Sequence, residues 1–185
     1  MRTLISAAHI SLDGFMATLE GDMSFLSFDE ELADHTYPLM KTVDTSVYGR
    51  FTYQMMDGYW PAVADAPDST AHEKSHARWY MGVNKIVASR TITSTDPKVH
   101  VVGDDIVAAL RAEKQQEGGD IMIFGSPTLM RTLSAAGIVD EWRLSLQPVA
   151  LGAGLPLFDA RANLQLRSSK TFRSGVIAAH YVTKR

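Results

Sequence analysis

The sequence of 185 residues contains no cysteine. Disulfide bonds, thiolate nucleophiles and zinc or iron–sulfur sites with cysteine ligands are therefore excluded together. The absence fits a reducing cytoplasm.

Long apolar runs and basic runs are also missing. The longest apolar runs are much shorter than the ~20 residues that a membrane-spanning helix needs, and the N-terminal residues show neither the long apolar region nor the cleavage site of a signal peptide. No run of Lys or Arg exceeds two residues and the formal net charge is -3, so nothing marks a nucleic-acid or membrane surface. We therefore expect a soluble, cytoplasmic protein whose partner is a small molecule.

The composition is that of a globular protein, with 45% hydrophobic and 21% charged residues. A chain of this length most simply forms one domain, and it is long enough to bury a sizeable core. We expect residues 1–185 to form that domain.

Short apolar runs alternate with segments of helical periodicity over the first two thirds of the chain. The runs that predict strands are 4–10, 45–48, 85–88, 99–102 and 120–124. The segments with apolar residues at helical spacing are 29–40, 69–81 and 104–114. Connections of this length between strands imply parallel pairing in a sheet that is covered on both faces.

The last third of the chain has a different pattern. Residues 142–147 alternate strictly, and 164–172 and 176–183 predict two further strands joined by a hairpin at Gly175. Residues 59–69, which include Pro61 and Pro67, predict a long surface loop. The predicted fold is a single α/β domain, with a mostly parallel central sheet flanked by helices and an antiparallel C-terminal extension.

Three turns that follow predicted strands could bind phosphate. Gly49-Arg50 follows the strand at 45–48, and helical periodicity resumes at once, so the free N–H groups of a first helical turn lie beside a guanidinium. Gly125-Ser126-Pro127 follows the strand at 120–124, where Ser126 could cap a helix. In an open α/β sheet such turns gather at the carboxyl ends of the strands.

The third turn contains Ser89 and Arg90, which follow the strand at 85–88 and suit a phosphorylated ribose. Each of the three turns has a purely structural alternative. The first could be a simple turn with a solvated arginine, the second a capped helix start, and the third a polar loop.

One short motif points to a different chemistry. His72-Glu73-Lys74-Ser75-His76 has the HExxH spacing, in which two imidazoles share a zinc ion and the glutamate activates its water. A third ligand is needed, and nothing in the sequence marks one. A polar helix face is the alternative, and we predict no metal.

Several stretches together resemble the dihydrofolate reductase-like superfamily, and within it the reductase domain of bacterial riboflavin biosynthesis. The matching stretches are SLDGFMA, YGRFTYQMM, IMIFGSPTLMRTL and IVDEWRLSLQPVALGAGLPLF. They occur in the expected order over nearly the whole chain, and the last is the most specific.

The resemblance implies an NADPH-binding fold and assigns roles by position. Gly49, Arg50 and Thr52 match a turn in which the arginine contacts the 2′-phosphate and the threonine the pyrophosphate region. Ser89 and Arg90 match the loop that holds the adenosine phosphate. The remaining matches are Gly125, Ser126 and Thr128 under the pyrophosphate, and Asp13 and Gly14 beside the nicotinamide and substrate.

From the resemblance we predict an NADPH-dependent reductase that acts on a small heterocyclic or conjugated substrate, with Asp13 as the candidate catalytic residue. Asp13 could serve the substrate or only cap its turn. The acids near the predicted first helix are alternative proton donors, and they are Asp29, Glu30, Glu31 and Asp34. Phe25, Leu26 and Phe28 predict an apolar substrate pocket.

We also expect a homodimer, because Trp142 and Leu144 on an alternating strand would offer a second apolar face. Two other functions stay open. One is a non-catalytic binding protein of the same fold, and the other is a zinc hydrolase built on the motif at 72–76.

Overall fold

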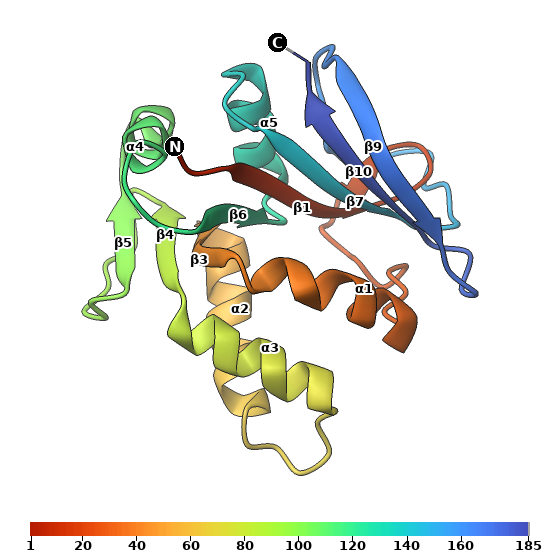
Figure 1. Cartoon of the computed structure of the whole chain (residues 1–185), viewed down its shortest axis with the longest axis horizontal. Coiled ribbons are helices and arrows are strands. Elements are labelled where there is room, and N and C mark those ends of the chain that lie inside the picture. Colours follow the sequence, from red (N-terminus) through yellow and green to blue (C-terminus); the bar gives the residue numbers. More distant parts are fainter. Residues whose placement is uncertain (185) are drawn as a thin grey trace.

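An eight-stranded sheet forms the centre of the molecule, in the order β5-β4-β3-β6-β1-β7-β10-β9 (Figure 1). The computed structural model describes residues 1–184. The strands of this sheet are β1 (Leu4–Ile10), β3 (Val43–Gly49), β4 (Asn84–Ala88), β5 (Val99–Val102), β6 (Asp120–Phe124), β7 (Glu141–Leu146), β9 (Leu164–Thr171) and β10 (Ile177–Thr183). A second, two-stranded sheet pairs β2 (Phe15–Ala17) with β8 (Leu155–Pro156).

The strands from β5 to β7 are parallel, and the end of the sheet is antiparallel. Parallel pairs join β5 to β4, β4 to β3, β3 to β6, β6 to β1 and β1 to β7. Strand β10 then runs antiparallel to β7, and β9 antiparallel to β10. The predicted α/β fold with a mostly parallel sheet and an antiparallel C-terminal extension is therefore confirmed.

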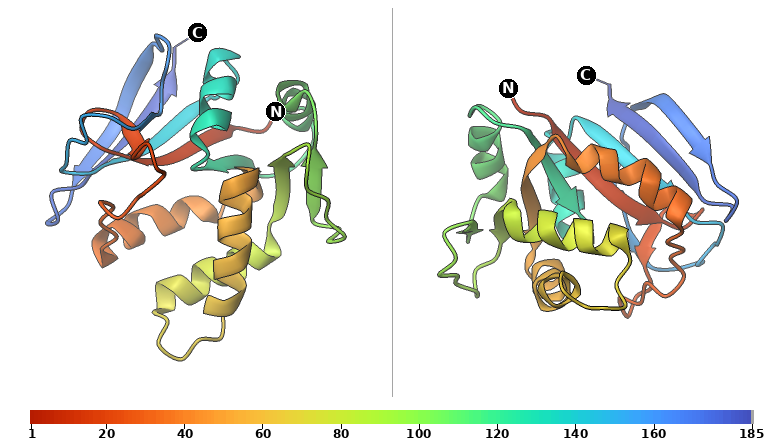
Figure 2. Two further views of the ribbon diagram at one scale, coloured as in Figure 1. Left: turned by 180° about the vertical axis from the view of Figure 1, so that it is seen from behind. Right: turned by 60° about the horizontal axis from the view of Figure 1, so that its bottom comes forward.

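Helices cover both faces of the sheet. They are α1 (Glu30–Met40), α2 (Arg50–Val63), α3 (Ala71–Gly82), α4 (Ile106–Glu113) and α5 (Pro127–Ala135). Figures 1 and 2 show α4 and α5 on one face and α1, α2 and α3 on the other. No helix within residues 1–184 is both long enough and apolar enough to cross a membrane.

The larger apolar core lies between the sheet and helices α4 and α5. Leu4 of β1, Leu110 of α4 and Leu133 of α5 are all fully buried in it. Trp142 and Leu144 of β7 belong to the same core and are only 2% and 5% exposed. The prediction that these two side chains form a free apolar face is therefore wrong, because α5 follows β6 and covers them.

The prediction of a surface loop over residues 59–69 is also wrong in its first part. Helix α2 continues to Val63 with Pro61 inside its last turn. Val63 packs against Ala77 of α3 and Trp60, so apolar burial stabilises a turn that Pro61 would otherwise weaken by removing a donor. Residues 64–70 alone connect α2 to α3.

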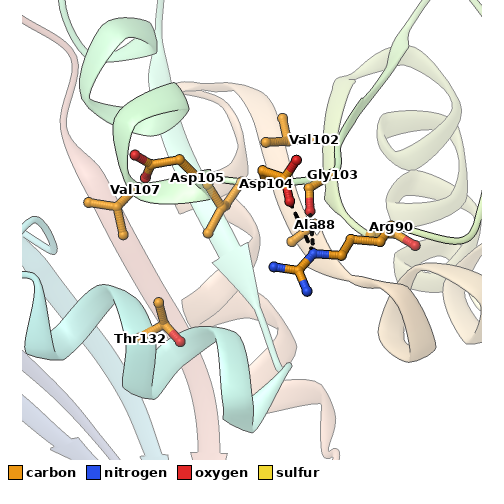
Figure 3. A pocket seen from close by; sticks show the side chains of 10 residues that line it. Ala88, Arg90, Val102, Gly103, Asp104, Asp105, Val107 and Thr132 are labelled. Carbon is orange, nitrogen blue, oxygen red and sulfur yellow. Dashed lines mark hydrogen bonds and ion pairs between the residues drawn. The ribbon is translucent and has the colours of Figure 1, made fainter.

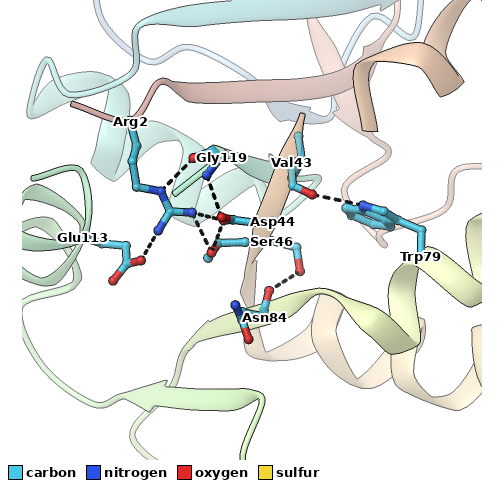
Figure 4. Close-up of polar contacts among 9 residues, drawn as sticks. Arg2, Val43, Asp44, Ser46, Trp79, Asn84, Glu113 and Gly119 are labelled. Carbon is cyan, nitrogen blue, oxygen red and sulfur yellow. Dashed lines mark hydrogen bonds and ion pairs between the residues drawn. The ribbon is translucent and has the colours of Figure 1, made fainter. Parts of the chain in front are cut away.

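A buried arginine connects several elements at the amino-terminal edge of the parallel strands through hydrogen bonds and ion pairs (Figure 4). Arg2 is only 7% exposed, and its guanidinium forms ion pairs with Asp44 and Glu113. Its Nη2 also donates to Thr45 Oγ1 at 2.8 Å, and its Nε donates to the Gly119 carbonyl at 2.8 Å. One side chain thus joins β3, the end of α4 and the segment that leads into β6.

Replacing this arginine tests how much the network contributes. We expect Arg2→Met to lower the free energy of unfolding by about 2–3 kcal/mol, because both carboxylates lose their partner but still reach some solvent. Urea denaturation measures the change. Arg78→Met, at an exposed position of α3, should stay within about 0.5 kcal/mol of the native protein. Equal effects of the two substitutions would contradict a special role of Arg2.

Candidate functional site

The three predicted phosphate-binding turns lie at one edge of the sheet. Strands β4, β3 and β6 are parallel neighbours. Their carboxyl ends therefore place Ser89-Arg90, Gly49-Arg50 and Gly125-Ser126 next to one another, as expected for the ligand-binding edge of an α/β sheet.

Ser126 connects two of these turns directly. Its Oγ accepts a hydrogen bond of 2.8 Å from the Gly49 N–H and donates one of 2.8 Å to Thr52 Oγ1. A Cβ on Gly49 would lie 3.3 Å from Ser126 Oγ, so the close approach favours glycine at this position. The start of α2 and the start of α5 are thus held together by one hydroxyl group.

This contact changes the role of Ser126 that the sequence predicts. Ser126 occupies the N-cap position of α5, but its side chain makes no capping hydrogen bond because it points to Gly49 and Thr52. Its φ of 60° is the only positive value among the non-glycine residues of 1–184. Strained backbone of this kind is concentrated at functional sites.

Helices α2 and α5 differ from the other helices in how they begin. Helices α1, α3 and α4 are capped by the side chains of Asp29, Thr70 and Asp105. Within residues 1–184, only α2 and α5 start without a side-chain cap, after Gly49 and Ser126. Their first turns therefore keep N–H groups and the positive end of the helix dipole for another acceptor.

Arg50 stands at the first position of α2. Its guanidinium carbon lies 4.4 Å from the centre of the Phe51 ring, and Phe51 is 76% exposed. No ion pair of Arg50 with a carboxylate is found within residues 1–184. The positive charge of Arg50 therefore lies beside the start of α2, which has no side-chain cap, and can attract an anion. Thr128, on the first turn of α5, is exposed.

Ser89 and Arg90 stand at the end of β4 beside an open cavity of about 360 Å³ (Figure 3). The hydroxyl of Ser89 accepts from the N–H groups of Thr91 and Ile92 at 3.1 and 3.2 Å, so it stabilises its own turn. Arg90 Nε donates to Asp104 Oδ1 at 3.1 Å and to the Gly103 carbonyl at 3.2 Å. Neither terminal nitrogen of Arg90 has a hydrogen-bond partner within residues 1–184.

Asp13 lies in the turn between β1 and β2. Its carboxylate accepts from Ser11 Oγ at 2.6 Å, from the Gly152 N–H at 2.7 Å and from the Leu151 N–H at 3.1 Å. The hydrogen bond from Ser11, followed by those from Gly152 and Leu151, lowers the pKa of Asp13 to about 2. Asp13 therefore joins the turn between β1 and β2 to the loop before β8, and it is ionised at neutral pH, which favours the structural alternative.

The four acids near the first helix also have structural or solvent-exposed positions. Asp29 caps α1 through the Leu32 N–H at 2.7 Å, and Glu31 pairs with Arg173 at 2.7 Å. The remaining two are Glu30, which is exposed, and Asp34, which lies 3.0 Å from His72 Nε2.

The end of β1 carries a histidine that the sequence did not single out. The ring centre of His9 lies 4.6 Å from that of Phe28 in an edge-on arrangement, and burial lowers the pKa of His9 to about 4. Gln147 is also near this ring, with Nε2 3.5 Å from His9 Nδ1. A neutral imidazole and an aromatic ring thus lie close to the loop that Asp13 holds.

The motif at 72–76 is used in helix packing. The Glu73 carboxylate accepts from Thr70 N–H at 2.8 Å and so completes a capping box at the start of α3. The ring of His76 lies 4.0 Å from that of Trp60. No group of three side chains suited to a metal occurs in the described part of the chain, so the geometry gives the zinc alternative no support.

Residues 2–178 match the family model described as the RibD C-terminal domain. The chain belongs to the RibD C-terminal domain family. One relative is the uncharacterized protein YyaP of Bacillus subtilis (strain 168), which is 32% identical over 183 residues, covering 97% of this chain and 94% of YyaP. The resemblance inferred from the sequence motifs is therefore confirmed.

Solved structures agree with this membership of the RibD C-terminal domain family. A pyrimidine reductase-like protein from Corynebacterium diphtheriae has a TM-score of 0.69 at 18% identity, covering 100% of this chain and 92% of that one. Dihydrofolate reductase from Enterococcus faecalis, solved with NADP(H), has a TM-score of 0.63 at 14% identity, covering 99% and 97%. At these identities the likeness establishes the fold alone, which is similar to that of dihydrofolate reductase.

Ser126 allows a matched test of the junction between α2 and α5. Ser126→Ala should lower the free energy of unfolding by about 1–3 kcal/mol, because the Gly49 N–H loses its partner. Ser126→Gly loses the same hydroxyl but should be more stable than Ser126→Ala by about 1 kcal/mol, since glycine adopts positive φ without strain. Chemical denaturation of both variants gives the comparison, and a more stable alanine variant would contradict the argument.

His76 predicts a pH dependence of stability. Burial lowers its pKa from 6.5 to about 4, so the unfolded chain binds a proton in this range that the folded chain does not. Stability should be complete above pH 6.5 and fall by up to roughly 3 kcal/mol as the pH decreases towards 4.

Urea unfolding between pH 4 and 7 measures this effect. His76→Phe should reduce the slope of stability against pH, while the half-buried His9 retains its own contribution. His100→Phe, at an exposed position of β5, is the control and should leave the slope unchanged. A slope that is the same in all three proteins would show that His76 does not titrate as described.

Proposed function

We propose that the chain is an NADPH-dependent reductase that transfers hydride to a small heterocyclic or conjugated substrate. The observation that carries this proposal is that two helix starts without a side-chain cap are joined at Ser126, at the same edge of the sheet as the cavity lined by Arg90, whose two terminal nitrogens have no hydrogen-bond partner within residues 1–184. Free N–H groups, helix dipoles and guanidinium groups at the carboxyl edge of one parallel sheet suit a dinucleotide with several phosphates.

The residues present fit the parts of NADPH. The first turns of α2 and α5 would bind the pyrophosphate through backbone N–H groups and Thr128, although Pro127 offers no N–H. Arg50 and Arg90 would bind phosphate through their guanidinium groups. The cavity at the ends of β4 and β5 would take the adenosine, with Ala88 and Val102 as apolar walls.

The bound nicotinamide would supply the hydride. The protein would orient the ring and the substrate and exclude water. His9 at the end of β1 and Phe28 before α1, whose rings are in contact, would lie beside the substrate, and the Asp13 hydrogen bonds hold the turn between β1 and β2 in place. We assign Asp13 to positioning this loop, because a carboxyl with a pKa of about 2 does not donate a proton at neutral pH.

The relatives support the reductase assignment. The pyrimidine reductase-like protein and the dihydrofolate reductase with NADP(H) share this fold. We also propose a homodimer in the cytoplasm. Strand β9, at the edge of the sheet, is exposed along nearly its whole length, and exposed edges pair with a second chain more readily than buried ones.

Fluorescence titration with NADPH and NADH tests the proposed function. NADPH should bind, and Arg50→Ala should weaken its binding by about 1.5–3 kcal/mol through loss of a charged hydrogen bond to phosphate. Arg78→Ala, on the exposed side of α3, serves as the control. Failure of both nucleotides to bind would overturn the proposal, and binding without any turnover of a reducible heterocycle would favour the non-catalytic alternative.

A further inference from the structure

The cavity beside Arg90 combines apolar walls with an unusual set of charges. It opens between the ends of β4 and β5, the start of α4 and Thr132 of α5 (Figure 3). Its apolar walls are Ala88, Val102, Ile106 and Val107. The charged side chains that line it are two carboxylates and one guanidinium, so the lining is acidic overall.

The two carboxylates have different tasks. Asp105 caps α4 by accepting from the Ala108 N–H at 2.9 Å. Asp104 instead accepts from Arg90 Nε at 3.1 Å, and its side chain is 90% exposed. Asp104 therefore contacts the guanidinium of Arg90 at Nε, and the two terminal nitrogens have no hydrogen-bond partner within residues 1–184.

We propose that Asp104 sets the discrimination between the two nicotinamide dinucleotides. The inference rests on the proposed function, in which this cavity takes the adenosine. The negative charge of Asp104 repels a 2′-phosphate that Arg90 binds. The carboxylate oxygens of Asp104 accept hydrogen bonds from a ribose 2′-hydroxyl that carries no phosphate. The cavity thus takes both NADPH and NADH, with a smaller preference for NADPH than Arg90 alone would give.

The charge and the hydrogen bond of Asp104 act in opposite directions. The hydrogen bond to Nε holds the guanidinium in a geometry that suits phosphate, whereas the charge repels it. When a phosphate dianion and the Asp104 carboxylate both contact the Arg90 guanidinium, they repel each other. In water at low salt this repulsion weakens the affinity for the phosphorylated ligand by about fivefold to tenfold. Asp104→Asn separates the two effects, because an asparagine oxygen still accepts from Arg90 Nε but carries no charge.

The test uses two ligands that differ only in the 2′-phosphate. Isothermal titration calorimetry of the full chain at low ionic strength measures the affinities of adenosine 2′,5′-bisphosphate and AMP. NADPH and NADH are titrated in parallel. The variants are Asp104→Asn, Arg90→Gln and, as a control, Asp96→Asn.

The control removes the same charge outside the cavity. Asp96 accepts from the Lys98 N–H at 2.9 Å, a hydrogen bond that asparagine can keep, and it does not line the cavity beside Arg90. Asp96→Asn should leave the ratio of the two affinities unchanged.

Asp104→Asn should bind the bisphosphate about fivefold to tenfold more tightly while AMP binding stays equal or weakens. The gain should shrink at high salt, and Arg90→Gln should reduce the preference for the bisphosphate. An unchanged ratio in Asp104→Asn, or the same gain in Asp96→Asn, would overturn the inference.

The failure of this inference can be told apart from failure of the proposed function. Wild-type binding of NADPH and NADH with no response to Asp104→Asn removes only the role of Asp104. Absence of binding of all four nucleotides to the wild-type protein rejects the proposed function and the role of Asp104 together.

Discussion

The hydrogen bonds of the Ser126 hydroxyl are the contact on which the candidate site depends. They join the Gly49 N–H and Thr52 Oγ1, and so fix the starts of α2 and α5 relative to each other. The hydroxyl makes no capping hydrogen bond to α5, and the backbone at Ser126 has a positive φ. The result is a pair of helix starts whose N–H groups face the same region without a side-chain partner.

At the opposite edge of the sheet, the charged and polar groups are paired with one another. There the Arg2 guanidinium is saturated by carboxylates, a hydroxyl and a carbonyl. Unpaired polar groups are costly when they are buried, so the carboxyl edge can keep free donors only where they stay open to solvent or a ligand. The parallel strands place the Arg2 network and the groups of the candidate site at opposite ends of the same strands.

Much of this arrangement could be predicted from the sequence, because strand-to-glycine transitions at Gly49 and Gly125 are local signals and parallel strands place such turns at one edge. The features that depend on contacts between distant parts of the chain could not be predicted from the sequence. The alternation at Trp142 and Leu144 reads equally well as a free face or a buried one until α5 is in place. Pro61 suggests a loop only if the packing of Val63 on Ala77 is unknown. Asp104 follows the end of β5 and could have been noticed as another strand-end residue, but its contact with Arg90 joins two separate turns.

The order of the strands has a consequence for synthesis of the chain. Every residue of the Ser126 junction and of the cavity beside Arg90 lies at or before Thr132, whereas β7, β9 and β10 come later. On the ribosome the part of the chain that contains the candidate site therefore emerges first, and the C-terminal hairpin is added last at the far side of β7. An exposed β7 edge is the temporary state of the nascent chain, and the antiparallel hairpin closes it within the same molecule.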